Sequence, residues 1–149
     1  MTEQQITKGW IVFMIQLIYG QKGSGKTKRL LDMCNEEVRV TDGSVVFIDD
    51  DKRYLREVPR EVRFVDVSEY DITTADGLFG FVCGMYAQNY DIGAFYIDAF
   101  LKIVGNEPSQ LKLFFDKFSK FCAENNIKAV FSVSANAADA PDFLKDMII

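Results

Sequence analysis

One short glycine-rich segment constrains the fold of this chain more than any other part of its sequence. Residues 20–27 read Gly-Gln-Lys-Gly-Ser-Gly-Lys-Thr and match the pattern G-x-x-x-x-G-K-[ST] at every fixed position. An apolar run, residues 11–19, leads directly into this segment. After it, apolar residues recur at the spacing of an amphipathic helix, at Leu30, Leu31, Cys34 and Val38. The sequence therefore predicts a strand, a tight loop and a helix, in that order.

The residue types of this loop suit the binding of several phosphate groups. Glycine at positions 20, 23 and 25 leaves the backbone free to wrap an anion with its N–H groups, and the helix adds the positive end of its dipole. The pattern predicts that Lys26 neutralises the β and γ phosphates and that the Thr27 hydroxyl completes the shell of a Mg²⁺ ion. We therefore expect ATP and Mg²⁺ as cofactors, with the nucleotide held by Gly20, Gln21, Lys22, Gly23, Ser24, Gly25, Lys26 and Thr27.

Composition narrows the classes of function that remain. A chain of 149 residues with 48% hydrophobic residues is long and apolar enough for one globular domain. The net charge of −5 argues against a dedicated nucleic-acid binder, so we expect no nucleic-acid partner. The chain has no histidine, which excludes imidazole catalysis and histidine metal ligands. Its three widely spaced cysteines suit reduced thiols in a cytoplasmic protein.

The first 13 residues contribute little to the predicted order of strand, loop and helix. Met14 stands inside the apolar run, and a strand over residues 14–19 suffices to lead into the loop. We therefore expect residues 1–13 to be a dispensable extension and residues 14–149 to form a single nucleotide-binding domain. The apolar run is broken by Gln16 and is too short to cross a bilayer, so we expect no membrane span.

Strands and helices are expected to alternate along the rest of the chain. Further strands are predicted over residues 44–48, 62–67, 93–98 and 129–133, with helices starting near Thr73, Asn106 and Pro141. Without hairpin signals, this alternation predicts a three-layer α/β fold, with a mainly parallel five-stranded sheet and helices on both faces. In the second helix, we expect Gly80 and Gly84 to pack closely on the sheet.

Polar residues stand where the predicted strands end, and the carboxyl ends of parallel strands meet at one edge of a sheet. Asp98 ends an apolar strand in the Walker B pattern, so we expect it to hold Mg²⁺ together with Thr27. Ala99 follows, at the place where hydrolytic enzymes of this class commonly carry a glutamate, which predicts slow hydrolysis. Ser134 ends the last strand, where we expect contact with the γ-phosphate, although turn chemistry also favours serine there.

Three consecutive aspartates end another predicted strand. Asp49, Asp50 and Asp51 are placed to supply a base or a substrate contact from the side, and a solvated strand end is the alternative. We take Asp50 as a catalytic candidate, together with Lys26 and Asp98. Any chemistry at this edge therefore relies on carboxylates, lysine, hydroxyl groups and the metal.

These residues together resemble the P-loop NTPase superfamily, and residues 14–149 resemble a group of small bacterial P-loop ATP-binding proteins, some labelled twitching motility ATPases. The resemblance rests on residues 14–27 and on the stretches 89–91 and 95–100. It implies a P-loop NTPase fold. Because Asp98 falls on the fourth predicted strand, the RecA-like branch is favoured.

The leading prediction for function is Mg²⁺-dependent ATP binding with slow or partner-stimulated hydrolysis. Such a chain acts as a nucleotide-dependent switch or a minimal ATPase, with an unknown protein partner. The alternative is a small-molecule kinase of the nucleoside type; it is disfavoured because no arginine follows Arg63 to serve as a lid. A GTPase lacks its Asn-Lys-x-Asp motif here. An ordinary glycine-rich turn in a structural protein is the remaining reading.

Overall fold

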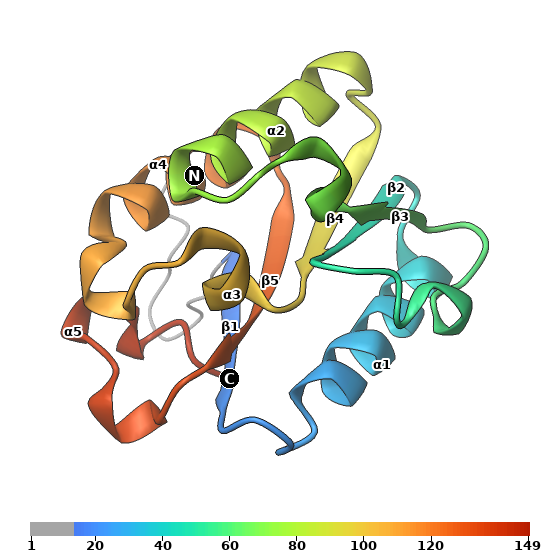
Figure 1. The fold of residues 1–149 in the computed structure, drawn as a ribbon. Coiled ribbons are helices and arrows are strands. Elements are labelled where there is room, and N and C mark those ends of the chain that lie inside the picture. The colour runs from blue at the N-terminus through green and yellow to red at the C-terminus, as the bar shows by residue number, and fades with distance from the viewer. Residues whose placement is uncertain (1–13) are drawn as a thin grey trace.

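The structure is a computed structural model that describes residues 14–149, so the prediction for residues 1–13 lies outside the described residues. It has an all-parallel five-stranded sheet with the strand order β1-β5-β4-β2-β3 and helices on both faces (Figure 1). The strands are β1 (Ile15–Gly20), β2 (Ser44–Asp49), β3 (Arg63–Asp66), β4 (Ile92–Ile97) and β5 (Lys128–Ser134). The helices are α1 (Lys26–Val40), α2 (Ala75–Gln88), α3 (Phe100–Val104), α4 (Lys112–Asn125) and α5 (Asp142–Lys145). The predicted three-layer α/β class is confirmed.

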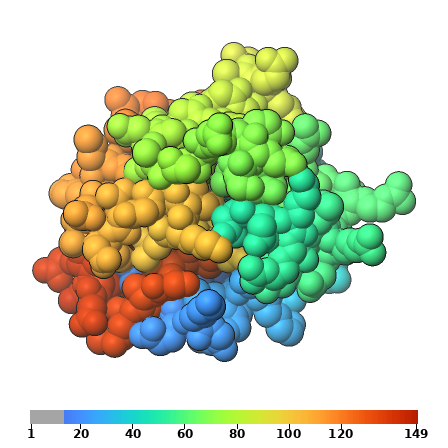
Figure 2. Space-filling model, in the orientation of Figure 1, coloured from blue at the N-terminus to red at the C-terminus, as the bar shows by residue number. Residues whose placement is uncertain are grey.

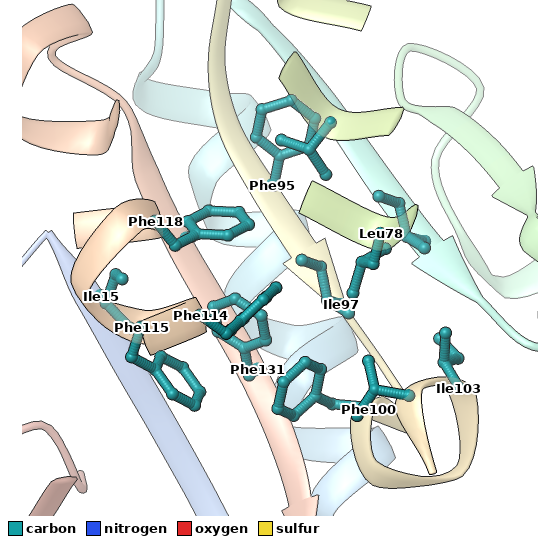
Figure 3. Close-up of a cluster of buried hydrophobic side chains, with 14 of the residues drawn as sticks. Ile15, Leu78, Phe95, Ile97, Phe100, Ile103, Phe114, Phe115, Phe118 and Phe131 are labelled. Carbon is teal, nitrogen blue, oxygen red and sulfur yellow. The ribbon is translucent and has the colours of Figure 1, made fainter. Parts of the chain in front are cut away.

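Each face of the sheet is covered by its own helices. Helix α1 packs on one face, where its buried residues Leu30, Leu31 and Cys34 meet the sheet. Helices α2, α3 and α4 cover the other face with a cluster of aromatic rings (Figure 3). Phe100 and Phe131 lie at its centre, with ring centroids 4.9 Å apart at a steep angle. Burying a phenylalanine stabilises the fold by about 1.5–3 kcal/mol, so this cluster anchors β5 and the turn after β4.

The two-residue period of the strands decides which side chains face α1. The α1 side of the sheet takes Val45 and Phe47 from β2, Ala94 and Tyr96 from β4, and Val130 from β5. Successive side chains point to opposite faces, so the same alternation, continued, carries Asp49, Asp98 and Ser132 to the α1 side. These residues stand at the carboxyl ends of their strands, beside the loop that precedes α1.

The connection after β4 differs from the sequence expectation. Ala99 adopts a left-handed conformation, φ 54°, and α3 starts at the next residue. The helix expected from Asn106 begins instead at Lys112, after a short 3₁₀ turn over Pro108–Gln110. That turn has its own capping box, formed by Glu107 and Gln110, which local helical periodicity does not reveal.

The order of the strands within the sheet was not predicted from the sequence. Strand β5 lies between β1 and β4, so the strand that leads into the loop is not adjacent to the strand that ends at Asp98. None of the helices within residues 14–149 is both long enough and apolar enough to cross a bilayer.

The expectation that Gly80 and Gly84 pack closely on the sheet is wrong. Both glycines are exposed on α2, and a Cβ added at either one meets no atom within 4 Å. The buried side of α2 is formed by Leu78 and Val82 instead. The spacing of the two glycines placed them on one side of the helix but not on the side that packs.

These glycines provide a prediction about stability. Replacing Gly80 or Gly84 with alanine should stabilise the fold by about 0.5–1 kcal/mol each, because alanine loses less backbone entropy in a helix. For a chain of this length, that corresponds to a rise in Tm of roughly 1–4 °C per variant. Thermal unfolding followed by circular dichroism measures the effect, and a fall in Tm at either position would show that the open space is needed.

Candidate functional site

The glycine-rich loop connects β1 to α1 and has the backbone geometry that its sequence requires. Gly23 and Gly25 adopt left-handed conformations, with φ of 82° and 91°, and Gly25 is the N-cap of α1. At Gly20 a Cβ would lie 2.3 Å from the Ser24 hydroxyl, so any side chain there would push into the loop. The first turn of α1 carries no acidic side chain that would compete with an anion for its N-terminus. The loop therefore presents a concave, electropositive surface.

A hydrogen bond to the loop backbone holds the side chain of Lys26 in place. Its ammonium group donates to the carbonyl oxygen of Gln21 at 3.0 Å, and the residue is 9% exposed. Burial lowers the pKa of Lys26, while the nearby carboxylate of Asp98 acts in the opposite direction. A partly desolvated ammonium group interacts more strongly with an incoming anion than a solvated one does.

Thr27 and Asp98 meet although 71 residues separate them in the sequence. The Thr27 hydroxyl donates to Oδ2 of Asp98 at 2.9 Å, and Asp98 is 5% exposed. The other oxygen, Oδ1, accepts a hydrogen bond from the Ser132 hydroxyl at 2.5 Å. Ser132 also accepts from the backbone N–H of Ala99 at 3.0 Å. The carboxylate is therefore held in one orientation from two sides.

Ser132 is the residue of this site that the sequence reasoning missed. The sequence pattern favours Ser134, two residues later, because Ser134 ends the strand. Ser134 lies opposite Gly20 in the β1–β5 register and is exposed, while Ser132 is 2% exposed. The available signal was a single hydroxyl inside an otherwise apolar strand, since a buried hydroxyl needs a hydrogen-bond partner.

The three aspartates after β2 have different environments. Asp50 forms an ion pair with Lys102 at 2.7 Å, and both carboxylate oxygens of Asp51 accept hydrogen bonds from Arg53. Asp49 is 2% exposed, and its Oδ1 accepts a hydrogen bond from the backbone N–H of Asp50 at 2.7 Å. Its Oδ2 is buried and has no hydrogen-bond partner within the described part of the chain.

The pKa values of Asp49 and Asp50 are shifted in opposite directions. Burial, together with the adjacent carboxyl group of Asp50, raises the pKa of Asp49 to about 8. Burial also acts to raise the pKa of Asp50, but the hydrogen bond and the charge of Lys102 outweigh it, so that pKa lies below its ordinary value. The predicted catalytic candidate Asp50 is thus already neutralised by a lysine, whereas Asp49 has no cation of its own among residues 14–149.

One cleft of about 900 Å³ brings these groups together. It runs from the loop across the strand ends to the segment that follows β2, and a volume of this size is typical of small-molecule sites. In the space-filling view, the loop segment (blue) is at the surface, next to the C-terminal segments (red) (Figure 2). The cleft is lined by loop and strand-end residues that include Lys22, Gly23, Gly25, Lys26, Thr27, Asp49, Asp50, Asp98, Ala99, Ser132 and Ser134.

Comparison with known proteins finds a solved structure with a similar fold, but it does not show what this chain does. No protein-family model matches the sequence, and neither does any curated protein. Among solved structures, the fold is similar to domain III of the Thermotoga maritima replication initiation protein DnaA, with a TM-score of 0.50 and 16% identity. The match covers 91% of this chain, which spans about half (51%) of the length of that solved chain. The likeness shows the fold alone, which is consistent with the P-loop NTPase type, and gives no support to the twitching motility label.

Proposed function

We propose that this chain binds ATP with Mg²⁺ in the cleft and hydrolyses it slowly, as a nucleotide-dependent switch or minimal ATPase. The observation that carries the proposal is the contact of 2.9 Å between the Thr27 hydroxyl and Asp98 Oδ2, directly beside the glycine-rich loop. Loop, hydroxyl and carboxylate come from separate parts of the sequence. Their convergence in one cleft is the combination that binding of a metal-complexed triphosphate requires.

The residues present fit a magnesium ion. Mg²⁺ takes oxygen ligands, keeps several waters and is commonly shared between one or two protein groups and the phosphates. A threonine hydroxyl and a buried carboxylate supply such oxygens here, and Ser132 holds the carboxylate in orientation. When bound, the ion would neutralise charge on the phosphate oxygens. Lys26 and the loop N–H groups would orient the triphosphate at the N-terminus of α1.

We expect ATP hydrolysis to be slow because of the residue that follows Asp98 in the sequence. Ala99 lines the cleft but has no carboxylate with which to position an attacking water. P-loop proteins without a supplied base or arginine turn over at rates on the order of 10⁻³ per second or below. We therefore propose that an unidentified protein partner stimulates hydrolysis, which suits a switch better than a metabolic enzyme.

The Thr27–Asp98 pair gives the test of this function. Thr27→Ala should weaken ATP binding about tenfold in Mg²⁺ and much less in EDTA, because the hydroxyl acts through the ion. Asp98→Ala should remove the Mg²⁺-dependent turnover. Isothermal titration of ATP with and without Mg²⁺ measures the first effect, and release of labelled phosphate measures the second.

Thr73→Ala, at an exposed threonine before α2, is the control and should bind ATP as the wild type does. Melting curves of both site variants check that they remain folded. If wild-type protein binds ATP equally well in EDTA and in Mg²⁺, or does not bind it, the proposed function is wrong.

A second candidate, transfer of the γ-phosphate to a small molecule, is favoured by the extent of the cleft. Beyond the aspartates, the cleft continues along Arg53, Tyr54 and Glu57, which gives room for a second ligand. A kinase would release ADP in excess of inorganic phosphate when nucleosides are added to the reaction. Equal amounts of both products with every nucleoside would leave hydrolysis as the reaction.

A further inference from the structure

The two edges of the sheet differ in what covers them. On the outer side of β1, the N–H of Leu17 donates to the carbonyl of Met147 at 2.9 Å, and the carbonyl of Leu17 accepts from the N–H of Ile149 at 3.0 Å. At the other edge, β3 pairs with β2 alone, and within residues 14–149 no strand lies on its outer side (Figure 1). An open edge presents backbone N–H and C=O groups with which another strand can pair.

A groove of about 880 Å³ runs along this open edge, and all of β3 lines it. Apolar side chains from the segment before β3 and from the residues after it also line the groove, namely Leu55, Val58, Pro59, Tyr70, Phe81 and Met85. Leu55 and Tyr70 are large and hydrophobic, yet they are 45% and 58% exposed. Exposed apolar groups beside an open strand edge mark a surface that is suited to contact with another chain.

The charges along the groove have opposite signs at its two ends. At the start of β3, two arginines stand against one glutamate, which leaves one net positive charge: Arg60, Glu61 and Arg63. At its end, two carboxylates stand against one lysine, which leaves one net negative charge: Asp66, Glu69 and Lys52. The groove therefore fits a strand that runs in the opposite direction and carries these charges in the same order along its own chain. A reversed copy of β3 is such a strand.

We propose that the open edge of β3 binds β3 of a second copy of this chain, antiparallel, across a twofold axis. A twofold interface uses the same patch on both copies, so the positive end of each groove lies beside the negative end of the other. The two sheets then join into one continuous sheet, and the exposed side chains of Leu55 and Tyr70 enter the interface. Charged side chains on an edge strand commonly prevent pairing, but in this orientation the two signs attract.

The segment between β2 and β3 connects this interface with the nucleotide cleft. Lys52 and Leu55 line the groove, whereas Arg53 and Tyr54, which lie between them in the sequence, line the cleft. Pairing of two copies would therefore hold one wall of each cleft in place. The pairing itself needs no nucleotide, so the inference stands or falls independently of the proposed function.

Sedimentation equilibrium of the full-length protein without nucleotide measures the pairing. At high concentration the wild type should reach twice the chain mass of 17.0 kDa. Arg63→Glu and Glu69→Lys should each weaken dimerisation at least about tenfold, because each brings like charges together at both ends of the interface. Arg39→Glu is the control, since Arg39 is an exposed arginine on α1 outside the groove, and it should dimerise as the wild type does.

An equimolar mixture of the two groove variants tests the antiparallel arrangement. In a mixed pair, the new acid of Arg63→Glu lies beside the new lysine of Glu69→Lys. At the other end, Glu69 of the first variant still meets Arg63 of the second. The mixture should therefore dimerise within about threefold of the wild type, although each variant alone does not.

Tyr70→Ser removes an apolar contact without changing charge and should also weaken dimerisation, whereas Tyr90→Ser, at a tyrosine that is 76% exposed outside the groove, should not. Far-ultraviolet circular dichroism checks that each variant is folded. Wild-type protein that remains a monomer up to about 500 μM overturns the inference. Dimerisation that neither Arg63→Glu nor Tyr70→Ser weakens would place the interface elsewhere and also overturns it. If the mixture fails to restore pairing, the antiparallel arrangement is wrong.

Discussion

Replacing Lys26 with alanine is expected to weaken Mg–ATP binding about a hundredfold, equivalent to roughly 2.7 kcal/mol. Lys26 is 9% exposed, and within residues 14–149 its ammonium group is tied to the loop only through the carbonyl of Gln21. The truncation removes the one cation that this loop holds partly desolvated, and hydrogen bonds to charged groups contribute about 1.5–3 kcal/mol. The loop backbone and α1 should be retained, since alanine is the best helix former.

The measurement is the dissociation constant of ATP in Mg²⁺ by isothermal titration. Lys120→Ala serves as the control, because Lys120 is an exposed lysine on α4, on the other face of the sheet. An affinity of Lys26→Ala within about threefold of the wild type would show that the glycine-rich loop is not the nucleotide site. A melting temperature near that of the wild type distinguishes a binding defect from unfolding.

The second large effect concerns stability and pH. Burial raises the pKa of Asp49 to about 8 in the folded chain, whereas an unfolded aspartate titrates near pH 3.9. Between these values the folded state holds a proton that the unfolded state has lost. The contribution of Asp49 to the free energy of unfolding is therefore fully present below about pH 4. It is lost as the pH rises toward 8, by up to about 1.4 kcal/mol per pH unit. Asp49→Asn removes this dependence and should be more stable than the wild type at neutral and alkaline pH.

The comparison is made by thermal unfolding without nucleotide, in EDTA, at pH 4 and at pH 8. The two proteins should melt together at pH 4, and the variant should be at least about 2 kcal/mol more stable at pH 8, a difference of roughly 4–8 °C in Tm. Equal melting temperatures at pH 8 would show that Asp49 is ionised at no cost in the fold.

Most of the layer architecture follows from local patterns in the sequence. The strands are parallel and buried on both faces, so their apolar runs stand out, and the helices between them show 3.6-residue periodicity. The glycine-rich loop can be predicted from the sequence because its requirements lie within one short segment: glycines where φ is positive, and a lysine at the start of the helix. The prediction that Gly80 and Gly84 pack on the sheet is wrong because helical periodicity shows only which residues share a side of the helix. The neighbouring elements decide which side packs against the sheet.

Within the candidate site, the sequence by itself determined the groups that are local to one segment or that end a recognisable strand. The glycine-rich loop, Lys26, Thr27 and Asp98 belong to these, and the structure brings them into one cleft. Only the tertiary structure decided the strand order, the contact of Ser132 with Asp98, and which aspartate after β2 has a free oxygen. The reason is physical. Asp49 and Asp50 are adjacent in sequence and chemically identical, and they differ only through burial and through Lys102, which helix α3 supplies.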